Sequence, residues 1–127
     1  MPIRPFEAQV RREQPRAVIL DLRGEIDASA EDALNAVYAE AEAARPDAIV
    51  LNFTDVDYIN STGIALVVGL LARARKQHIP LRACGLSEHY QEIFTITRLA
   101  DFMGMYDNER AALQDGHEPG AKTAETR

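Results

Sequence analysis

Hydrophobic and polar residues alternate with a period of two near the start of the chain, as is typical of β-strands. Residues 6–11 alternate strictly, whereas residues 17–23 open as a continuous apolar run, alternate at their end and stop at Gly24. The intervening Gln14-Pro15 is a turn sequence. The pattern therefore predicts an N-terminal hairpin of two strands.

The hydrophobic period then changes to that of a helix. Leu34, Val37 and Ala41 repeat at helical spacing, with acidic residues largely on the other faces. Ser29 is a suitable N-cap, and Arg45-Pro46 is a stop signal. We expect a helix over residues 29–44.

A strand covered on both sides is predicted at residues 48–53, because both of its alternating faces are apolar. Residues 54–59 are expected to form a loop. Helical spacing resumes after Asn60-Ser61 and continues to Lys76-Gln77, which predicts a second helix beginning at or next to Asn60-Ser61.

The rest of the pattern predicts further strands and a helix in alternation, as is typical of an α/β fold. Residues 79–84 are expected to form a strand, Ser87 to cap a third helix, and residues 102–106 to form a short last strand. Strand–helix–strand steps predict a mixed, mainly parallel sheet with helices packed against it. Residues 1–113 are expected to form one domain, and the polar, aperiodic residues 114–127 a disordered tail.

Composition and charge exclude several classes of protein. The chain has 127 residues, 46% of them hydrophobic, and a formal net charge of −6, which argues against a reader of the nucleic-acid backbone. The lone Cys84 cannot form an internal disulfide. The start has no apolar signal-peptide core, and the longest apolar run, residues 64–72, is shorter than the roughly 20 residues that cross a bilayer. We expect a cytoplasmic protein with no direct membrane insertion.

Residues 49–64, which end in Asn60-Ser61-Thr62-Gly63-Ile64, resemble the signature of STAS domains. This family includes sulfate-transporter cytosolic domains and bacterial anti-sigma factor antagonists. Residues 22–27 and 99–102 are also similar to family segments, and the resemblance spans about residues 6–108. It implies a single STAS-like domain.

The resemblance also implies a binding switch rather than an enzyme, with no cofactor. In the family, the first serine of the motif, here Ser61, is phosphorylated by a partner serine kinase that doubles as an anti-sigma factor, and a phosphatase restores binding. Thr62 is the second choice of acceptor. Asn60 stands where the family has Asp before the serine. Asn52 stands where the family commonly has Asp in the central strand. The neutral Asn60 removes repulsion against a phosphate, and it also removes a carboxylate that a kinase could use.

The expected partner surface lies where parallel strands end. It comprises Glu25, Asp27, Asp57, Tyr58, Asn60, Ser61, Thr62 and Gly63. A helix start carries unpaired N–H groups and partial positive charge, so it tolerates an added phosphate. Plain helix capping explains the same Asn-Ser-Thr sequence, and the carboxylates could equally be solvated loop charges. A divalent-ion site is less favoured because no calcium-loop spacing is present.

One other function remains open from the sequence. Stand-alone STAS subunits of phospholipid ABC transporters have similar motifs followed by apolar helices, so an accessory transport role is the alternative. An enzyme lacks a nucleophile–base pair or a zinc-ligand set. Self-association into a homo-oligomer is compatible with the chain.

Overall fold

The chain forms five strands and four helices in the computed structural model, which describes residues 5–13 and 16–114. The strands are β1 (Glu7–Glu13), β2 (Ala17–Ile26), β3 (Ala48–Ile59), β4 (Leu81–Cys84) and β5 (Gly104–Tyr106). The helices are α1 (Glu31–Ala43), α2 (Ser61–Lys76), α3 (Glu88–Ile96) and α4 (Glu109–Gln114), with 3₁₀ turns at Ala28–Ala30 (η1) and Leu99–Asp101 (η2).

One mixed sheet carries all five strands, and their order in space, β1-β2-β3-β4-β5, repeats their order in the sequence. The pair β1–β2 is antiparallel, and each later neighbour is parallel. This arrangement confirms the α/β fold class and the N-terminal pair of antiparallel strands. The expected turn at Gln14-Pro15 and the expected tail beyond Gln114 lie outside the described residues.

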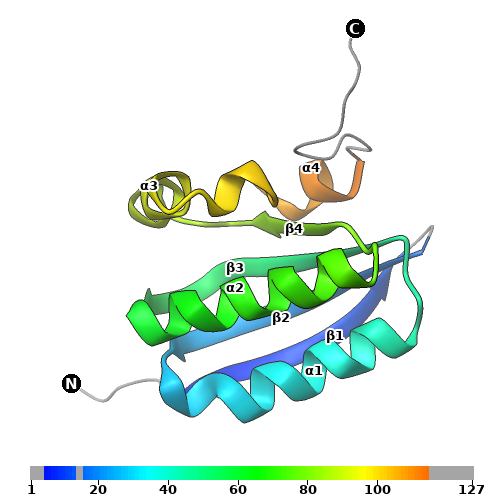
Figure 1. Cartoon of the computed structure of the whole chain (residues 1–127), viewed down its shortest axis with the longest axis horizontal. Coiled ribbons are helices and arrows are strands. Elements are labelled where there is room, and N and C mark those ends of the chain that lie inside the picture. The colour runs from blue at the N-terminus through cyan, green and yellow to red at the C-terminus, as the bar shows by residue number, and fades with distance from the viewer. Residues whose placement is uncertain (1–4, 14–15, 115–127) are drawn as a thin grey trace, which may run out of the picture.

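Alternating side chains of β2 and β3 divide the core between the two faces of the sheet. Figure 1 shows α1 and α2 lying over the same face. Val18, Leu20 and Leu22 belong to the larger cluster, which α1, α2 and α3 cover. Ile19 belongs to a smaller cluster on the other face, with Val50, Cys84 and Ala112 of α4. Cys84 is a buried free cysteine, and burial raises the pKa of its thiol to about 11.

Two boundary predictions near the end of β2 are wrong. Gly24 does not stop the strand, which continues to Ile26. The register with β3 shifts on either side of Gly24, with the extra residues on β3, and Gly24 has a φ of 87°. Ser29 is not the helix N-cap. Asp27 caps the preceding η1 turn instead, with its carboxylate accepting from the Ser29 N–H at 2.9 Å, and α1 begins at Glu31.

Other differences concern the later elements. Residues 54–59 extend β3 rather than forming a loop, because β2 continues beside them as a pairing partner. The last two strands begin later than expected, at Leu81 and Gly104. The short α4 has no counterpart in the sequence-based elements. The predicted Ser87 cap of α3 is confirmed.

Candidate functional site

The start of α2 meets the ends of β2 and β3, and Asn60 joins the three elements. Its side-chain oxygen accepts a hydrogen bond from the Gly63 N–H at 2.8 Å, so Asn60 is the helix N-cap. Its own backbone N–H donates to the carbonyl of Ile26 at 3.2 Å. Asn60 therefore caps the helix through an amide oxygen, without adding charge to the helix start.

Gly63 allows the helix start to lie directly on the end of β2. A Cβ at this position would lie 2.1 Å from the Ile26 carbonyl oxygen and 2.8 Å from a methyl carbon of Ile59. Both distances are far below van der Waals contact, so packing on the sheet requires glycine here. This geometry explains Gly63 by the packing of the helix start on the sheet.

Ser61 and Thr62 are exposed in the first turn of α2. Because Asn60 supplies the cap, the Ser61 hydroxyl has no hydrogen bond to any residue that the structure describes. The first turn also contains no acidic residue, so the partial positive charge of the helix start is not offset within the turn. Ser61 is thus accessible and chemically uncommitted.

Tyr90 of α3 fixes the end of β3 from the other side. Its hydroxyl accepts from the Ile59 N–H at 2.9 Å and donates to the Ile59 carbonyl at 3.3 Å. β4 stops opposite Asn52, so at Ile59 a tyrosine side chain takes the place of a neighbouring strand. The residue before the Asn60 cap is therefore held by α3.

We expect Tyr90→Phe to lower the free energy of unfolding by about 1–3 kcal/mol, because it leaves the buried Ile59 N–H without its acceptor. Urea unfolding would measure the change. Tyr38→Phe is the matched control, since the Tyr38 hydroxyl is buried with no partner among the described residues, and burial raises its pKa to about 12. That variant should gain about 1 kcal/mol. Equal effects of the two substitutions would contradict the role assigned to Tyr90.

The acidic residues expected at the site lie around the same end of the sheet. Glu25 stands opposite Tyr58 in the β2–β3 register, and the next residue of β2, Ile26, stands opposite Ile59. Asp27 follows directly, and the Ser29 hydroxyl and backbone N–H lower the pKa of its carboxyl. Asp57 lines a cavity of about 180 Å³ between β3 and α3, which Tyr90 also lines.

Asn52, the second position that departs from the family, is not at this site. It lies on the other face of the sheet, where its amide donates to Asp21 at 2.9 Å and its oxygen accepts from the Thr54 hydroxyl at 2.7 Å. Arg11 pairs with Asp21 and also with Glu109 of α4. The hydrogen bond from Arg11 is the main cause of a lowered Asp21 pKa.

The structure thus gathers the expected residues at one end of the sheet and excludes Asn52 from the group. Sequence reasoning missed Tyr90 as a contributor, because its position on α3 indicated only an apolar helix face. The preceding Ser87 cap was a usable signal, since it places the first turn of α3 near the strand ends.

The described residues contain no group of three or more His, Cys, Asp or Glu side chains that could hold a metal ion. Among the described helices, none combines the length and the apolar character needed to cross a membrane.

The family model of the STAS domain matches residues 8–112, so the chain belongs to the STAS domain family. No curated protein matches the chain.

Solved structures share the fold at low identity. An anti-sigma factor antagonist from Mycobacterium paratuberculosis is 18% identical, with a TM-score of 0.74 over 86% of this chain and 92% of that one. The Bacillus cell fate determinant SpoIIAA in its phosphorylated form is 22% identical, with a TM-score of 0.64 over 83% and 96%. SpoIIAA in its unphosphorylated form is 20% identical, with a TM-score of 0.65 over 83% and 92%.

Proposed function

We propose that this protein is a phosphorylation-switched binding regulator, an anti-sigma factor antagonist of the cytoplasm that acts without catalysing a reaction. The start of α2 and the surrounding strand ends bind an anti-sigma factor or related serine kinase while Ser61 is unmodified. Phosphorylation of Ser61 by that partner releases the complex, and a serine phosphatase restores binding. The partner surface comprises Glu25, Asp27, Asp57, Tyr58, Asn60, Ser61, Thr62 and Gly63.

The observation that carries the proposal is the exposed, uncommitted Ser61 hydroxyl at the start of a helix that Asn60 caps. A kinase can reach this hydroxyl without breaking a hydrogen bond of the fold. The existence of a neighbour solved in both phosphorylated and unphosphorylated forms supports a fold that tolerates the modification.

The energetic effect of phosphorylation falls on the interface rather than on the fold. A phosphate adds about −1.5 to −2 charges, which the helix start stabilises by only about 0.3–1 kcal/mol. The same charge inside an interface with acidic partner groups costs several kcal/mol. A penalty of ~3 kcal/mol weakens binding about a hundredfold, which is enough for a switch.

The test begins with affinity capture from the native cell, followed by mass spectrometry of both the partner and Ser61. Titration calorimetry then compares variants against the captured protein. Ser61→Asp should weaken binding by about tenfold, less than phosphate does, because aspartate carries one charge and fewer acceptor oxygens. Ser61→Ala should bind as the wild type and resist modification.

Ala65→Asp is a matched control, since it adds the same charge at an exposed position one turn further along α2. Its effect should be smaller than that of Ser61→Asp, and circular dichroism would confirm that each variant is folded. Wild-type affinity of Ser61→Asp, combined with loss of binding in Thr62→Ala, would show that the switch residue is wrong. Capture of transporter subunits alone would favour the accessory transport role.

A further inference from the structure

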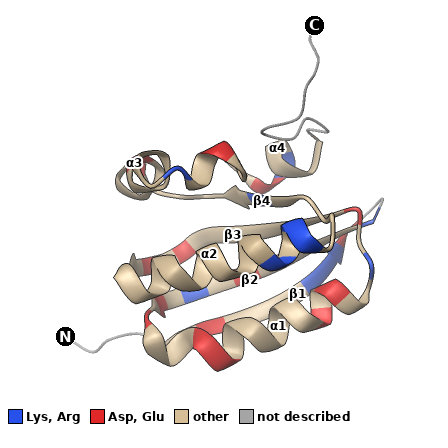
Figure 2. Ribbon diagram, viewed as in Figure 1, with Lys and Arg blue, Asp and Glu red and all other residues tan. Residues whose placement is uncertain are grey.

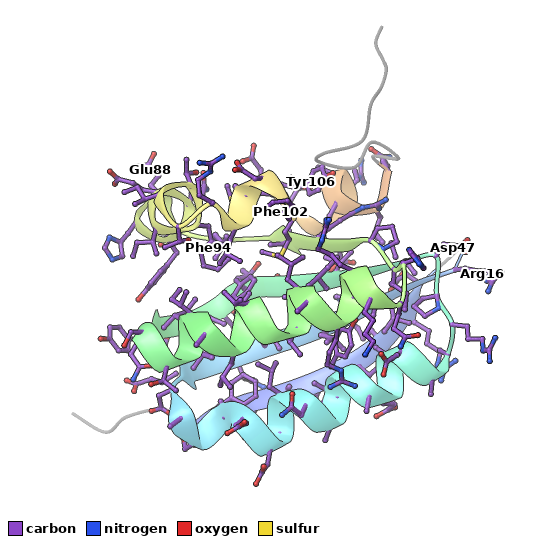
Figure 3. All side chains as sticks on the ribbon, viewed as in Figure 1. Arg16, Asp47, Glu88, Phe94, Phe102 and Tyr106 are labelled. Atoms are coloured by element: carbon purple, nitrogen blue, oxygen red, sulfur yellow. The ribbon has the colours of Figure 1, made fainter. Side chains whose placement is uncertain are left out.

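A groove lies at the end of the molecule opposite Ser61, where α1 and α2 finish. Two adjoining hollows, of about 390 and 640 Å³, share His78 and Ile79 in their walls. The first is lined mainly by apolar side chains, among them Leu71 and Phe102. Arg16 and Asp47 mark this end of the molecule in Figure 3, and Glu88 of α3 lies at the other end.

Phe102 gives the groove an exposed aromatic wall. Its side chain is 46% exposed, and the Arg75 guanidinium of α2 lies 4.8 Å from its ring centroid. The pair places an aromatic ring and a cation side by side, and these groups attract an aromatic side chain and a carboxylate respectively.

The charge around the groove is positive, although the whole chain carries −6. Figure 2 shows basic residues at the C-terminal end of α2. Arg73 is paired with Glu42 at 2.9 Å, and Arg16 approaches Asp47 at 3.9 Å. Arg45, Arg75 and Lys76, in contrast, have no carboxylate partner within the described ranges.

Two residues at the groove hold a backbone conformation that favours glycine. Arg45 and His78 follow the ends of α1 and α2 with φ of 51° and 61°. Glycine would remove the cost of a left-handed residue, about 1–2 kcal/mol. The chain instead keeps cationic or ionisable side chains at both positions, where they line the larger hollow.

The opposite end of the same molecule carries the complementary chemistry. Tyr58 is a large hydrophobic side chain that is 50% exposed. Asp57 precedes it, and Glu25 stands opposite it in the neighbouring strand. The aromatic ring of Tyr58 matches the aromatic wall that Phe102 forms. Its acidic neighbours match the positive charge around the groove.

We propose that the groove binds the Tyr58 end of a second copy of this chain, with Tyr58 against Phe102 and Arg75. The contact is heterologous, so each copy uses a different end and the copies join head to tail. Every copy except the terminal one then has its Ser61 end covered. The inference goes beyond the regulatory function proposed above and does not depend on phosphorylation.

Sedimentation velocity of the full chain over a concentration series up to about 1 mM tests the proposal, because this series detects association with a Kd in the micromolar to millimolar range. We expect the sedimentation coefficient to rise with concentration at low ionic strength and to fall back in high salt. Arg75→Glu should weaken association by about tenfold or more. Arg110→Glu, an equal charge change on the exposed face of α4, should leave association unchanged.

Mixing two variants distinguishes this contact from a symmetric dimer. Arg75→Glu keeps an intact Tyr58 end, and Tyr58→Ala keeps an intact groove. Each should be monomeric alone, and an equal mixture should form a one-to-one dimer. A wild-type chain that stays monomeric, a mixture that stays monomeric, or association that survives Arg75→Glu would each overturn the proposal. None of these outcomes bears on whether Ser61 controls binding to a kinase.

Discussion

Replacing Gly63 with alanine is expected to lower the free energy of unfolding by about 2–4 kcal/mol, because the new methyl group collides with backbone that cannot move independently. The nearest atom, the Ile26 carbonyl oxygen, also accepts the Asn60 N–H. Moving β2 away would break this bond, and moving α2 would disturb the Asn60 cap. Urea unfolding measures the loss, and partner binding should fall with it.

Gly69→Ala is the matched control in the same helix. A Cβ at Gly69 meets nothing within 4 Å, so the substitution adds only helix propensity. It should raise the free energy of unfolding by about 0.5–1 kcal/mol. If Gly63→Ala were as stable as Gly69→Ala, the close contact between α2 and the end of β2 would be wrong.

Asn52→Asp is expected to destabilise this chain at neutral pH by about 1–3 kcal/mol. The Asn52 amide donates to Asp21 at 2.9 Å, and a carboxylate cannot donate this bond. Two carboxylates would then face each other beside Arg11. Because they repel, the pair holds one proton more tightly, so its apparent pKa rises above the value of the unfolded chain.

The pH dependence of stability should therefore differ in sign between the two proteins. In the wild type, the pKa of Asp21 is lowered, so its contribution is present above the unfolded carboxyl pKa of about 3.9 and is lost as the pH falls through the folded value. In Asn52→Asp, the raised pKa of the pair makes stability fall as the pH rises from about 4 toward neutrality.

Asn108→Asp controls for the added charge. The Asn108 side chain accepts from the Ala111 N–H at 2.9 Å at the start of α4, and aspartate can accept the same bond. Its stability should match that of the wild type at neutral pH. Urea midpoints at several pH values would measure all three proteins, and a flat Asn52→Asp profile would contradict a direct contact between residues 52 and 21.

The sequence predicted elements well where their signals are local. The helical spacing after Asn60-Ser61 placed α2 correctly, and Ser87 placed α3, because caps and periodicity act within a few residues. The extension of β3 to Ile59 was missed because β2 supplies its pairing from more than 30 residues earlier. The six-residue α4 is too short to show a period.

The candidate site was likewise predictable only where a local motif marks its residues. The motif located Ser61 and Asn60, but the hydrogen bonds of Tyr90 to Ile59 join residues 31 positions apart and leave no pattern in the sequence. Asn52 lies in the same strand as the site, yet its side chain points to the opposite face. Only the pairing with Asp21 shows why an amide suits this position.

The order of the strands also determines how the sheet can be assembled during synthesis. Because β1 to β5 occupy the sheet in chain order, every strand that leaves the ribosome pairs with the strand made just before it. No late strand has to be inserted between two earlier ones, so the loops that close during folding stay short. The growing sheet presents a new open edge only beside its most recent strand, and this limits the surface through which incomplete chains can aggregate.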